Sequence, residues 1–156
     1  MRVRHGKRQD SKGFLKLVDA LAAYEKLDPP TREGKVRIVK DIFDRKLVRL
    51  LVAEAHGALV GYALYFYTYS SFLALPTLYL EDLFVLEEER GKGAGRALFM
   101  KCVELARREG CGRMEWSVLT WNRSAIGFYE KLGAKRMDDW YVYRLDRRGL
   151  ESLTGD

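Results

Sequence analysis

The stretch Tyr79 to Phe99 reads YLEDLFVLEEERGKGAGRALF, and it joins a strand, a glycine-rich turn and the start of a helix. Leu78 to Val85 has the aromatic and apolar residues of a buried strand, yet it contains two carboxylates, Glu81 and Asp82, which a core strand normally excludes. After the turn, a helical pattern places four small or apolar residues on one face: Ala94, Leu98, Cys102 and Leu105. The stretch therefore predicts a strand that leads through the turn into a helix.

The turn at residues 90–95 has the features of an anion-binding site. Glycines let the backbone approach a ligand closely, and the N–H groups at a helix start point toward an anion. A P-loop is excluded because Arg96 and Ala97, not Lys and Ser or Thr, follow Gly95. The glycines at every second position also do not fit a dinucleotide fingerprint. A phosphate is the natural ligand, and a helix entry with flexible glycines is the alternative.

Three segments carry a resemblance to a known family. The pattern Arg90-x-x-Gly93-x-Gly95, after a strand and before a helix, resembles the acetyl-coenzyme A pyrophosphate loop of the GNAT family of N-acetyltransferases. Together with residues 79–85, residues 60–69 and 121–129 resemble its diamine branch, the spermidine/spermine and thialysine acetyltransferases. The resemblance covers nearly the whole chain. It implies an α/β GNAT fold, a mixed central sheet with splayed central strands and flanking helices, acetyl-CoA as cosubstrate, and a homodimer.

The resemblance also implies a coenzyme site. The backbone around Leu83 would pair with the pantetheine arm as an added strand, and Asn122 would contact the coenzyme, although N-capping of a helix alone would explain that residue. The sequence departs from the branch at Arg123, where an acid is common, and at Ser124, where Pro is usual. The residues expected to bind the coenzyme are Leu83, Phe84, Val85, Arg90, Gly91, Lys92, Gly93, Ala94, Gly95, Arg96, Asn122, Ser124 and Ala125.

Acetyl transfer to an amine needs a neutral amine, a polarised carbonyl and a proton for the departing thiolate. By resemblance, Glu81 binds the amine and helps to deprotonate it, with Asp82 as a second carboxylate. A regular strand would point these neighbours to opposite faces, and the family resolves this with a bulge. Tyr129 is expected to be the general acid, because a phenol is protonated at neutral pH. A helical Phe-Tyr pair that belongs to the core is the alternative.

The expected acceptor site is acidic. Four carboxylates, Glu25, Glu81, Asp82 and Asp138, would form a pocket for a cation with two or more amines, although Glu25 also fits a surface helix. This favours a small diamine, a polyamine or a lysine-like substrate. The expected substrate-binding residues are Tyr24, Glu25, Glu81, Asp82, Glu115, Trp116, Ser117 and Asp138. A protein N-terminal or lysine acetyltransferase is the second hypothesis, because fold alone does not fix the acceptor.

The bulk properties favour one soluble domain that spans residues 1–156. The net charge of +6 would also fit a non-catalytic nucleic-acid-associated module, but the basic residues are scattered and no nucleic-acid motif accompanies them. No signal peptide is readable, and the longest apolar run, residues 59–69, is too short to span a membrane. Cys102 and Cys111 lack zinc-site spacing, so we expect reduced thiols, no metal and a cytoplasmic location.

The remaining sequence predicts a β-α-α-β-β-β-α-β-α-β order. Asp10 and Thr31 are expected to cap the first two helices, Asn122 to cap the last, and Gly133 to stop it. The expected strands are residues 2–6, 47–55, 59–69, 78–85, 113–118 and 140–145, with a loop at 70–77. The expected helices run to about residues 27 and 44, from about 94 to 110, and from 123 to 132.

Overall fold

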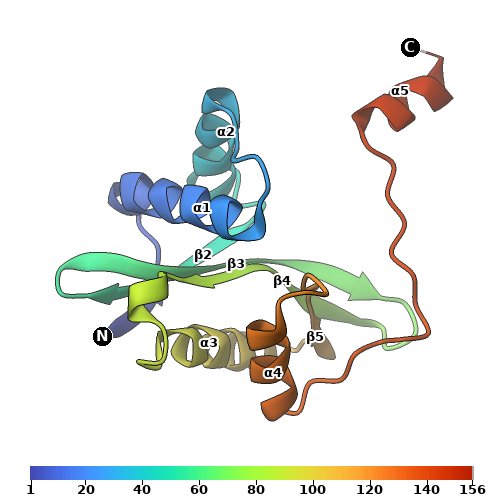
Figure 1. Ribbon diagram of the computed structural model, residues 1–156. Coiled ribbons are helices and arrows are strands. Elements are labelled where there is room, and N and C mark those ends of the chain that lie inside the picture. Colours follow the sequence, from blue (N-terminus) through green and yellow to red (C-terminus); the bar gives the residue numbers. More distant parts are fainter. Residues whose placement is uncertain (156) are drawn as a thin grey trace. The chain divides into compact units, whose positions relative to one another are not determined.

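The computed structural model describes residues 1–155, and it divides the chain into two compact units, Met1–Ser117 and a second that begins at Val118. The first unit contains a sheet, whose strands are β1 (Arg2–His5), β2 (Arg49–Ala55), β3 (Ala58–Ser70), β4 (Leu75–Val85) and β5 (Arg113–Glu115). Its helices are α1 (Ser11–Glu25), α2 (Arg32–Phe43) and α3 (Ala94–Arg108), with short 3₁₀ turns η1 (Arg8–Asp10) and η2 (Glu87–Glu89). Figure 1 shows these elements.

The strands lie in the order β1-β2-β3-β4-β5. The first four are antiparallel to their neighbours, whereas β5 pairs with β4 in parallel. A parallel pair needs a long crossover, and α3 supplies it. The mixed sheet with a parallel βαβ unit is therefore confirmed, and the unit lies at one edge of the described sheet because β5 is its last strand.

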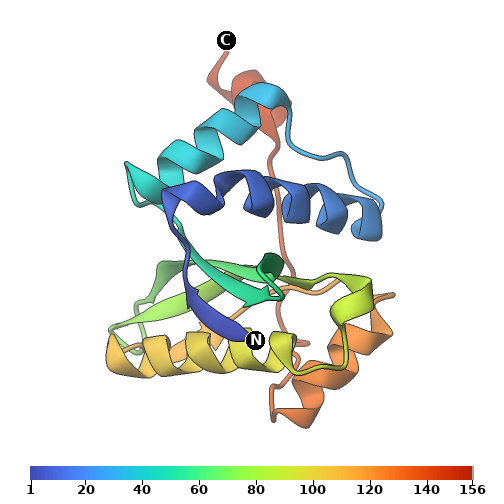
Figure 2. The same cartoon turned by 90° about the vertical axis from the view of Figure 1, so that its left-hand side faces the viewer.

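Helices cover both faces of this sheet. In Figure 2, α1 and α2 lie on one side of the strands and α3 lies on the other. Phe14 and Leu17 of α1 pack with Tyr62 of β3 and Phe84 of β4 in one core cluster. The predicted inner face of α3 is also confirmed, because all four of its residues are buried: Ala94, Leu98, Cys102 and Leu105. Cys102 is thus a core residue.

Strand β4 carries the bulge that the two carboxylates require. Across the β3–β4 ladder, Leu64 faces Asp82 and Tyr65 faces Leu80, so Glu81 has no cross-strand partner. Strand β5 pairs with β4 only from Thr77 to Tyr79. In the described residues, the edge of β4 from 80 to 85 that faces away from β3 therefore has no strand partner. This is the expected splaying of the central strands.

Gly61 lets β3 approach β4 next to this edge. It pairs with Val85, and a Cβ atom at Gly61 would lie 2.7 Å from the carbonyl oxygen of Phe84. Because that neighbour is backbone, the strands would have to move apart. We expect Gly61→Ala to lower the free energy of unfolding by about 1–3 kcal/mol, the usual cost of overpacking. Urea denaturation measures this, with Gly127→Ala as control, because a Cβ there would meet nothing within 4 Å. Equal stability of the two variants would contradict the prediction.

The second unit contains α4 (Arg123–Lys131) and α5 (Arg147–Thr154). The predicted cap is confirmed, because Asn122 Oδ1 accepts a hydrogen bond from Ala125 N at 3.2 Å. Gly133 has a φ of 87°, as expected for the residue that ends a helix. Asp146 caps α5, which the sequence did not predict.

Three predicted elements differ from the structure. The last strand, residues 140–145, is wrong: this apolar stretch has no ladder partner, and Tyr141 is 86% exposed. An apolar pattern indicates a propensity to form a strand, but a strand also needs a neighbouring strand to pair with. Strand β5 ends at Glu115 rather than at residue 118, because β4 bulges just beyond the paired residues. The loop at 70–77 is shorter, since Ser70 Oγ accepts from Leu73 N and closes a tight turn.

Candidate active site

The glycine-rich loop has the conformation that a phosphate site needs. Gly91 and Gly93 have positive φ angles of 76° and 92°, and a Cβ atom at either would meet nothing within 4 Å. Gly93 is the N-cap of α3 and offers no side chain to cap it. The backbone N–H of Ala97 makes a helical bond to Gly93 O, so the N–H groups of residues 94–96 precede the first such bond. The loop therefore fits the phosphates of coenzyme A.

The charged side chains of this loop are held by neighbouring groups. Arg90 Nε donates to Val85 O at 3.0 Å, and its guanidinium lies 4.6 Å from the ring centre of Tyr24. Lys92 Nζ pairs with Glu89 Oε2 at 3.2 Å and stays largely exposed. Of the three predicted cations, Arg90 thus contacts α1 and β4, and Lys92 contacts η2. Arg96 is exposed on the first turn of α3.

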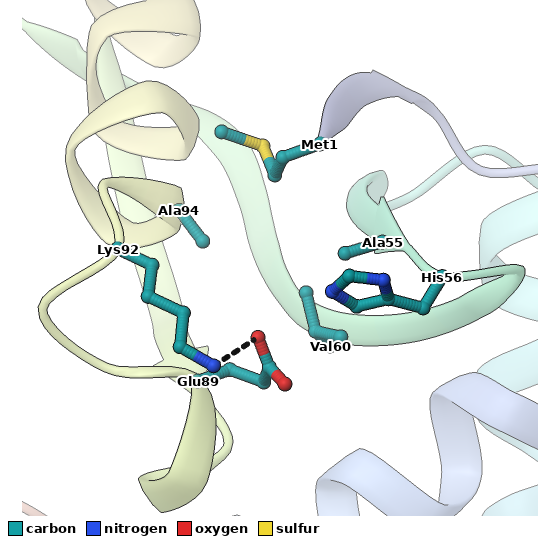
Figure 3. Close-up of a pocket in the computed structure, with 7 residues that line it drawn as sticks. All are labelled: Met1, Ala55, His56, Val60, Glu89, Lys92 and Ala94. Carbon is teal, nitrogen blue, oxygen red and sulfur yellow. Dashed lines mark hydrogen bonds and ion pairs between the residues drawn. The ribbon is translucent and has the colours of Figure 1, made fainter.

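A pocket of about 270 Å³ lies beside the loop (Figure 3). Figure 3 shows the Lys92–Glu89 pair on one side and His56 from the β2–β3 turn on the other. Its lining residues are Met1, Ala55, His56, Val60, Glu89, Lys92 and Ala94. Two of the predicted coenzyme residues, Lys92 and Ala94, line it, so it adjoins the phosphate loop.

The open edge of β4 presents backbone groups of alternate residues. Leu86 N donates to Val60 O of β3 at 2.9 Å, so residue 86 faces β3. Because backbone groups of successive strand residues face opposite edges, Leu83 and Val85 face away from β3 and Phe84 faces toward it. The Phe84 ring is buried in the core, and its place in the coenzyme site stays a prediction. Leu83 and Val85 remain as the groups for an added strand.

Asp82 is the carboxylate whose environment most favours proton transfer. Burial raises its pKa to about 6, and the nearby charges of Glu81 and Glu25 act in the same direction. A hydrogen bond from Tyr62 Oη, at 2.9 Å to Oδ2, opposes this rise. A pKa close to neutrality suits a general base.

Glu81 and Glu25 complete an acidic cluster around Asp82. Glu81 is exposed at the bulge, so the prediction of a buried strand over residues 78–85 does not hold at this position. Glu25 is half-buried at the end of α1, and burial raises its pKa. Two of the predicted carboxylates, Glu81 and Glu25, thus act on a third, Asp82, within the first unit.

Tyr62 is a site residue that the sequence did not reveal. Its side chain is fully buried, and burial together with the charge of Asp82 raises the pKa of its phenol far above the ordinary value. It therefore acts as a fixed hydrogen-bond donor that holds the Asp82 carboxylate. Tyr62 faces Phe84 across the ladder, two residues from Asp82, so the β3–β4 register was the signal that could have found it.

The remaining predicted acceptor residues make contacts within their own units. Glu115 pairs with Arg113 at 3.2 Å, Trp116 packs edge-to-face on Phe99, and Ser117 Oγ lies 3.3 Å from Tyr79 Oη. These lie at the end of β5 and just beyond it. In the second unit, Asp138 is exposed and pairs with Arg136.

Tyr129 and the second set of coenzyme residues belong to α4. Tyr129 is half-buried and packs edge-to-face on Phe128, with ring centres 5.4 Å apart. Asn122 uses its side-chain oxygen for the helix cap, Ser124 is exposed and Ala125 is half-buried. Their approach to the coenzyme, and that of Tyr129 to the thioester sulfur, stay predictions.

Residues 1–155 contain neither a metal-binding cluster nor a membrane-spanning helix. No group of three or more His, Cys, Asp or Glu side chains in this range could hold a metal ion. Within the same residues, no helix has the length and apolarity to cross a membrane.

The first unit thus combines a phosphate-binding loop, an open strand edge and carboxylates at a bulge. This combination defines an acyltransferase fold that binds coenzyme A. Comparison with known proteins agrees. The model of the "Acetyltransferase (GNAT) family" matches residues 16–134.

Two relatives and one solved structure illustrate the similarity. Thialysine N-epsilon-acetyltransferase of Bos taurus is 32% identical over 98% of this chain and 96% of its own length. L-ornithine N5-acetyltransferase NATA1 of Arabidopsis thaliana is 41% identical over 60% of this chain and 41% of its own length. An integron cassette protein of V. cholerae has a TM-score of 0.83 at 22% identity, over 99% of this chain and 98% of that one.

The chain belongs to the GNAT acetyltransferase family. It is an acetyl-CoA-dependent N-acetyltransferase, and amines are the class of acceptor. The predicted family, fold class and enzyme class are confirmed.

Proposed function

We propose that this enzyme acetylates a primary amine of a small cationic substrate, such as a diamine, a polyamine or a lysine-like amino acid. The observation that carries this is the cluster of Glu25, Glu81 and Asp82, in which burial, and after it the charges of Glu81 and Glu25, raises the pKa of Asp82. A cationic substrate relieves the repulsion within such a cluster. The relatives named for thialysine and ornithine support the same class, because each of those compounds is a small molecule with more than one cationic amine.

Glu81 and Asp82 have separate roles toward the amine in this proposal. Exposed Glu81 binds the ammonium group as it arrives. Asp82, with its pKa of about 6, takes the proton through a bound water and leaves a neutral amine nitrogen with a free lone pair. Tyr62 holds the Asp82 carboxylate in place during this transfer.

Direct transfer follows in a ternary complex. The amine nitrogen attacks the thioester carbonyl carbon, and a backbone N–H on the open edge of β4 polarises the carbonyl oxygen. The carbon–sulfur bond then breaks, and Tyr129 gives its hydroxyl proton to the departing thiolate. The attacking nitrogen, which carries one proton too many after the attack, loses that proton through water to the Tyr129 phenolate and so restores the phenol. The products are the N-acetylated amine and coenzyme A, and the Asp82 proton returns to solvent.

Initial-rate kinetics test the direct mechanism. With acetyl-CoA and the amine varied together, double-reciprocal lines that intersect support a ternary complex. Parallel lines, together with an acetylated protein detected by mass spectrometry in the absence of amine, would instead indicate a covalent intermediate. Mass spectrometry of the product identifies the acetylated nitrogen. Turnover of an N-terminal or lysine peptide without any small amine would favour the second hypothesis, a protein acetyltransferase.

We also propose that residues 1–156 work as one acetyltransferase domain, in the cytoplasm and as a homodimer. The family match extends across the boundary between the two units, which supports one domain. The end of the β3–β4 hairpin supports the dimer, because it presents an uncharged apolar surface: Tyr67, Tyr69, Phe72, Leu73 and Leu75 are each 39–99% exposed.

We therefore expect Phe72→Asp to convert a dimer to a monomer. Phe72 is 99% exposed, so the change leaves the fold of the monomer intact while it places a charge on the apolar surface. Light scattering after gel filtration measures the mass. Val36→Asp, at a 53% exposed site on α2, is the matched control and keeps the dimer. A dimeric Phe72→Asp protein would show that the interface lies elsewhere.

A further inference from the structure

Arg90 makes contacts that reach beyond the loop to which it belongs. Its Nε donates to Val85 O at the end of the open β4 edge, and its guanidinium lies over the Tyr24 ring at 4.6 Å and near the Phe84 ring at 5.7 Å. Tyr24 belongs to the last turn of α1 and precedes Glu25 of the acidic cluster. One side chain therefore joins the phosphate loop to the wall of the acceptor site.

The loop has few other anchors of this kind. Gly91 and Gly93 carry no side chain, and the positions that their Cβ atoms would take have no neighbour within 4 Å. Lys92 is held only through the exposed pair with Glu89. At Arg90 the backbone is also fixed, because its N–H donates to Glu87 O at 3.2 Å. Ala94 is buried and anchors the end of the loop where α3 begins. At the other end, movement of α1 at Tyr24 would reach the loop through Arg90.

The contacts that Arg90 makes suit an arginine side chain and not a lysine side chain. A planar guanidinium can stack on an aromatic ring while its Nε–H donates in the plane to a carbonyl oxygen. An ammonium group is a compact charge that cannot do both in the same way. A residue needed only for its charge near phosphate would tolerate lysine.

We propose that Arg90 is a positioning residue that couples the coenzyme loop to the Tyr24–Glu25 end of the acceptor site. Occupation of one site then stabilises the other, and the effect is reciprocal. The identity of the two ligands rests on the proposed function, whereas the physical link between α1 and the loop does not.

Hydrogen exchange followed by mass spectrometry tests the link without any turnover. Tyr24→Leu removes the ring, and we expect the hydrogen-bonded amides at the two ends of the loop, Arg90 N–H on Glu87 O and Ala97 N–H on Gly93 O, to exchange roughly 5-fold faster or more, at the lower end of typical coupling between sites. Tyr24→Phe keeps the ring, and the loop should keep the protection of the wild type. Unchanged loop exchange in Tyr24→Leu would overturn the proposal.

Calorimetric binding of coenzyme A gives a second readout. We expect Tyr24→Leu and Arg90→Lys each to weaken binding roughly 5-fold or more, and the double variant to be no weaker than either alone, because both break the same contact. Near-normal binding in Arg90→Lys, or additive losses in the double variant, would assign Arg90 to a simple charge role and overturn the proposal. If the Tyr24 and Arg90 variants bind coenzyme A as expected but the enzyme acetylates no small amine, only the proposed function is contradicted.

Discussion

Replacing Tyr129 with Phe is expected to lower kcat by a factor of about 10²–10⁴, the usual contribution of a positioned general acid. The substitution removes the hydroxyl proton that we assign to the departing thiolate and keeps the aromatic ring against Phe128. The affinity for coenzyme A should therefore change little. Single-turnover release of thiol, measured beside calorimetric binding of coenzyme A, separates the two effects.

The control for Tyr129→Phe is Tyr141→Phe. Tyr141 belongs to the same unit, loses the same hydroxyl and is 86% exposed, so its variant should turn over as the wild type does. A Tyr129→Phe enzyme with normal kcat would remove Tyr129 from the mechanism. A variant that loses coenzyme affinity as well as rate would make Tyr129 a binding residue instead.

Asp82→Asn is expected to lower kcat/KM for the amine by a factor of about 10² or more and to stabilise the fold at neutral pH. The folded-state pKa of Asp82, about 6, lies above the ordinary value of 3.8, so the folded protein binds this proton more tightly than the unfolded chain. Ionised Asp82 therefore costs stability. The cost is absent below pH 3.8, grows between pH 3.8 and about 6, and is fully present above.

Asparagine cannot ionise, yet it keeps an oxygen that accepts from Tyr62. Asp82→Asn should thus unfold at a higher temperature than the wild type at pH 7–8, with a gain of about 1–3 kcal/mol, and the difference should vanish near pH 4. Thermal unfolding across this pH range measures it. Glu81→Gln, at the exposed bulge position, should lose rate and show a smaller gain, because the Glu81 charge is only one of the causes that raise the pKa of Asp82. Parallel stability curves for Asp82→Asn and the wild type would contradict the assignment of the titrating group.

Much of the fold could be predicted because local pattern and packing agree. The inner face of α3 and the caps at Thr31 and Asn122 follow from spacing and capping chemistry, and all are present. Residues 140–145 show the limit of this reasoning. Their apolar pattern is that of a strand, but pairing depends on where a neighbouring strand lies, and propensity does not contain that information.

The candidate site could likewise be predicted in part from the sequence. The conformation of the glycine loop was predicted because glycine permits a close approach of the backbone to a ligand, and the bulge at Glu81 was predicted from the resemblance to the family. The partner of Asp82 was not, since Tyr62 lies 20 residues away and meets it only through the strand register. The role of Arg90 was also incomplete, because its contact with Tyr24 joins elements that are distant in sequence.

The most direct test of the account is release of the coenzyme A thiol when the wild-type protein meets acetyl-CoA and one acceptor at a time. The panel contains thialysine, lysine, ornithine, putrescine, spermidine and an N-terminal peptide. Rapid release with at least one small cationic amine, and slow release with the peptide, is the predicted result. Release with the peptide alone, or no release with any amine despite coenzyme A binding, would contradict the proposed substrate class.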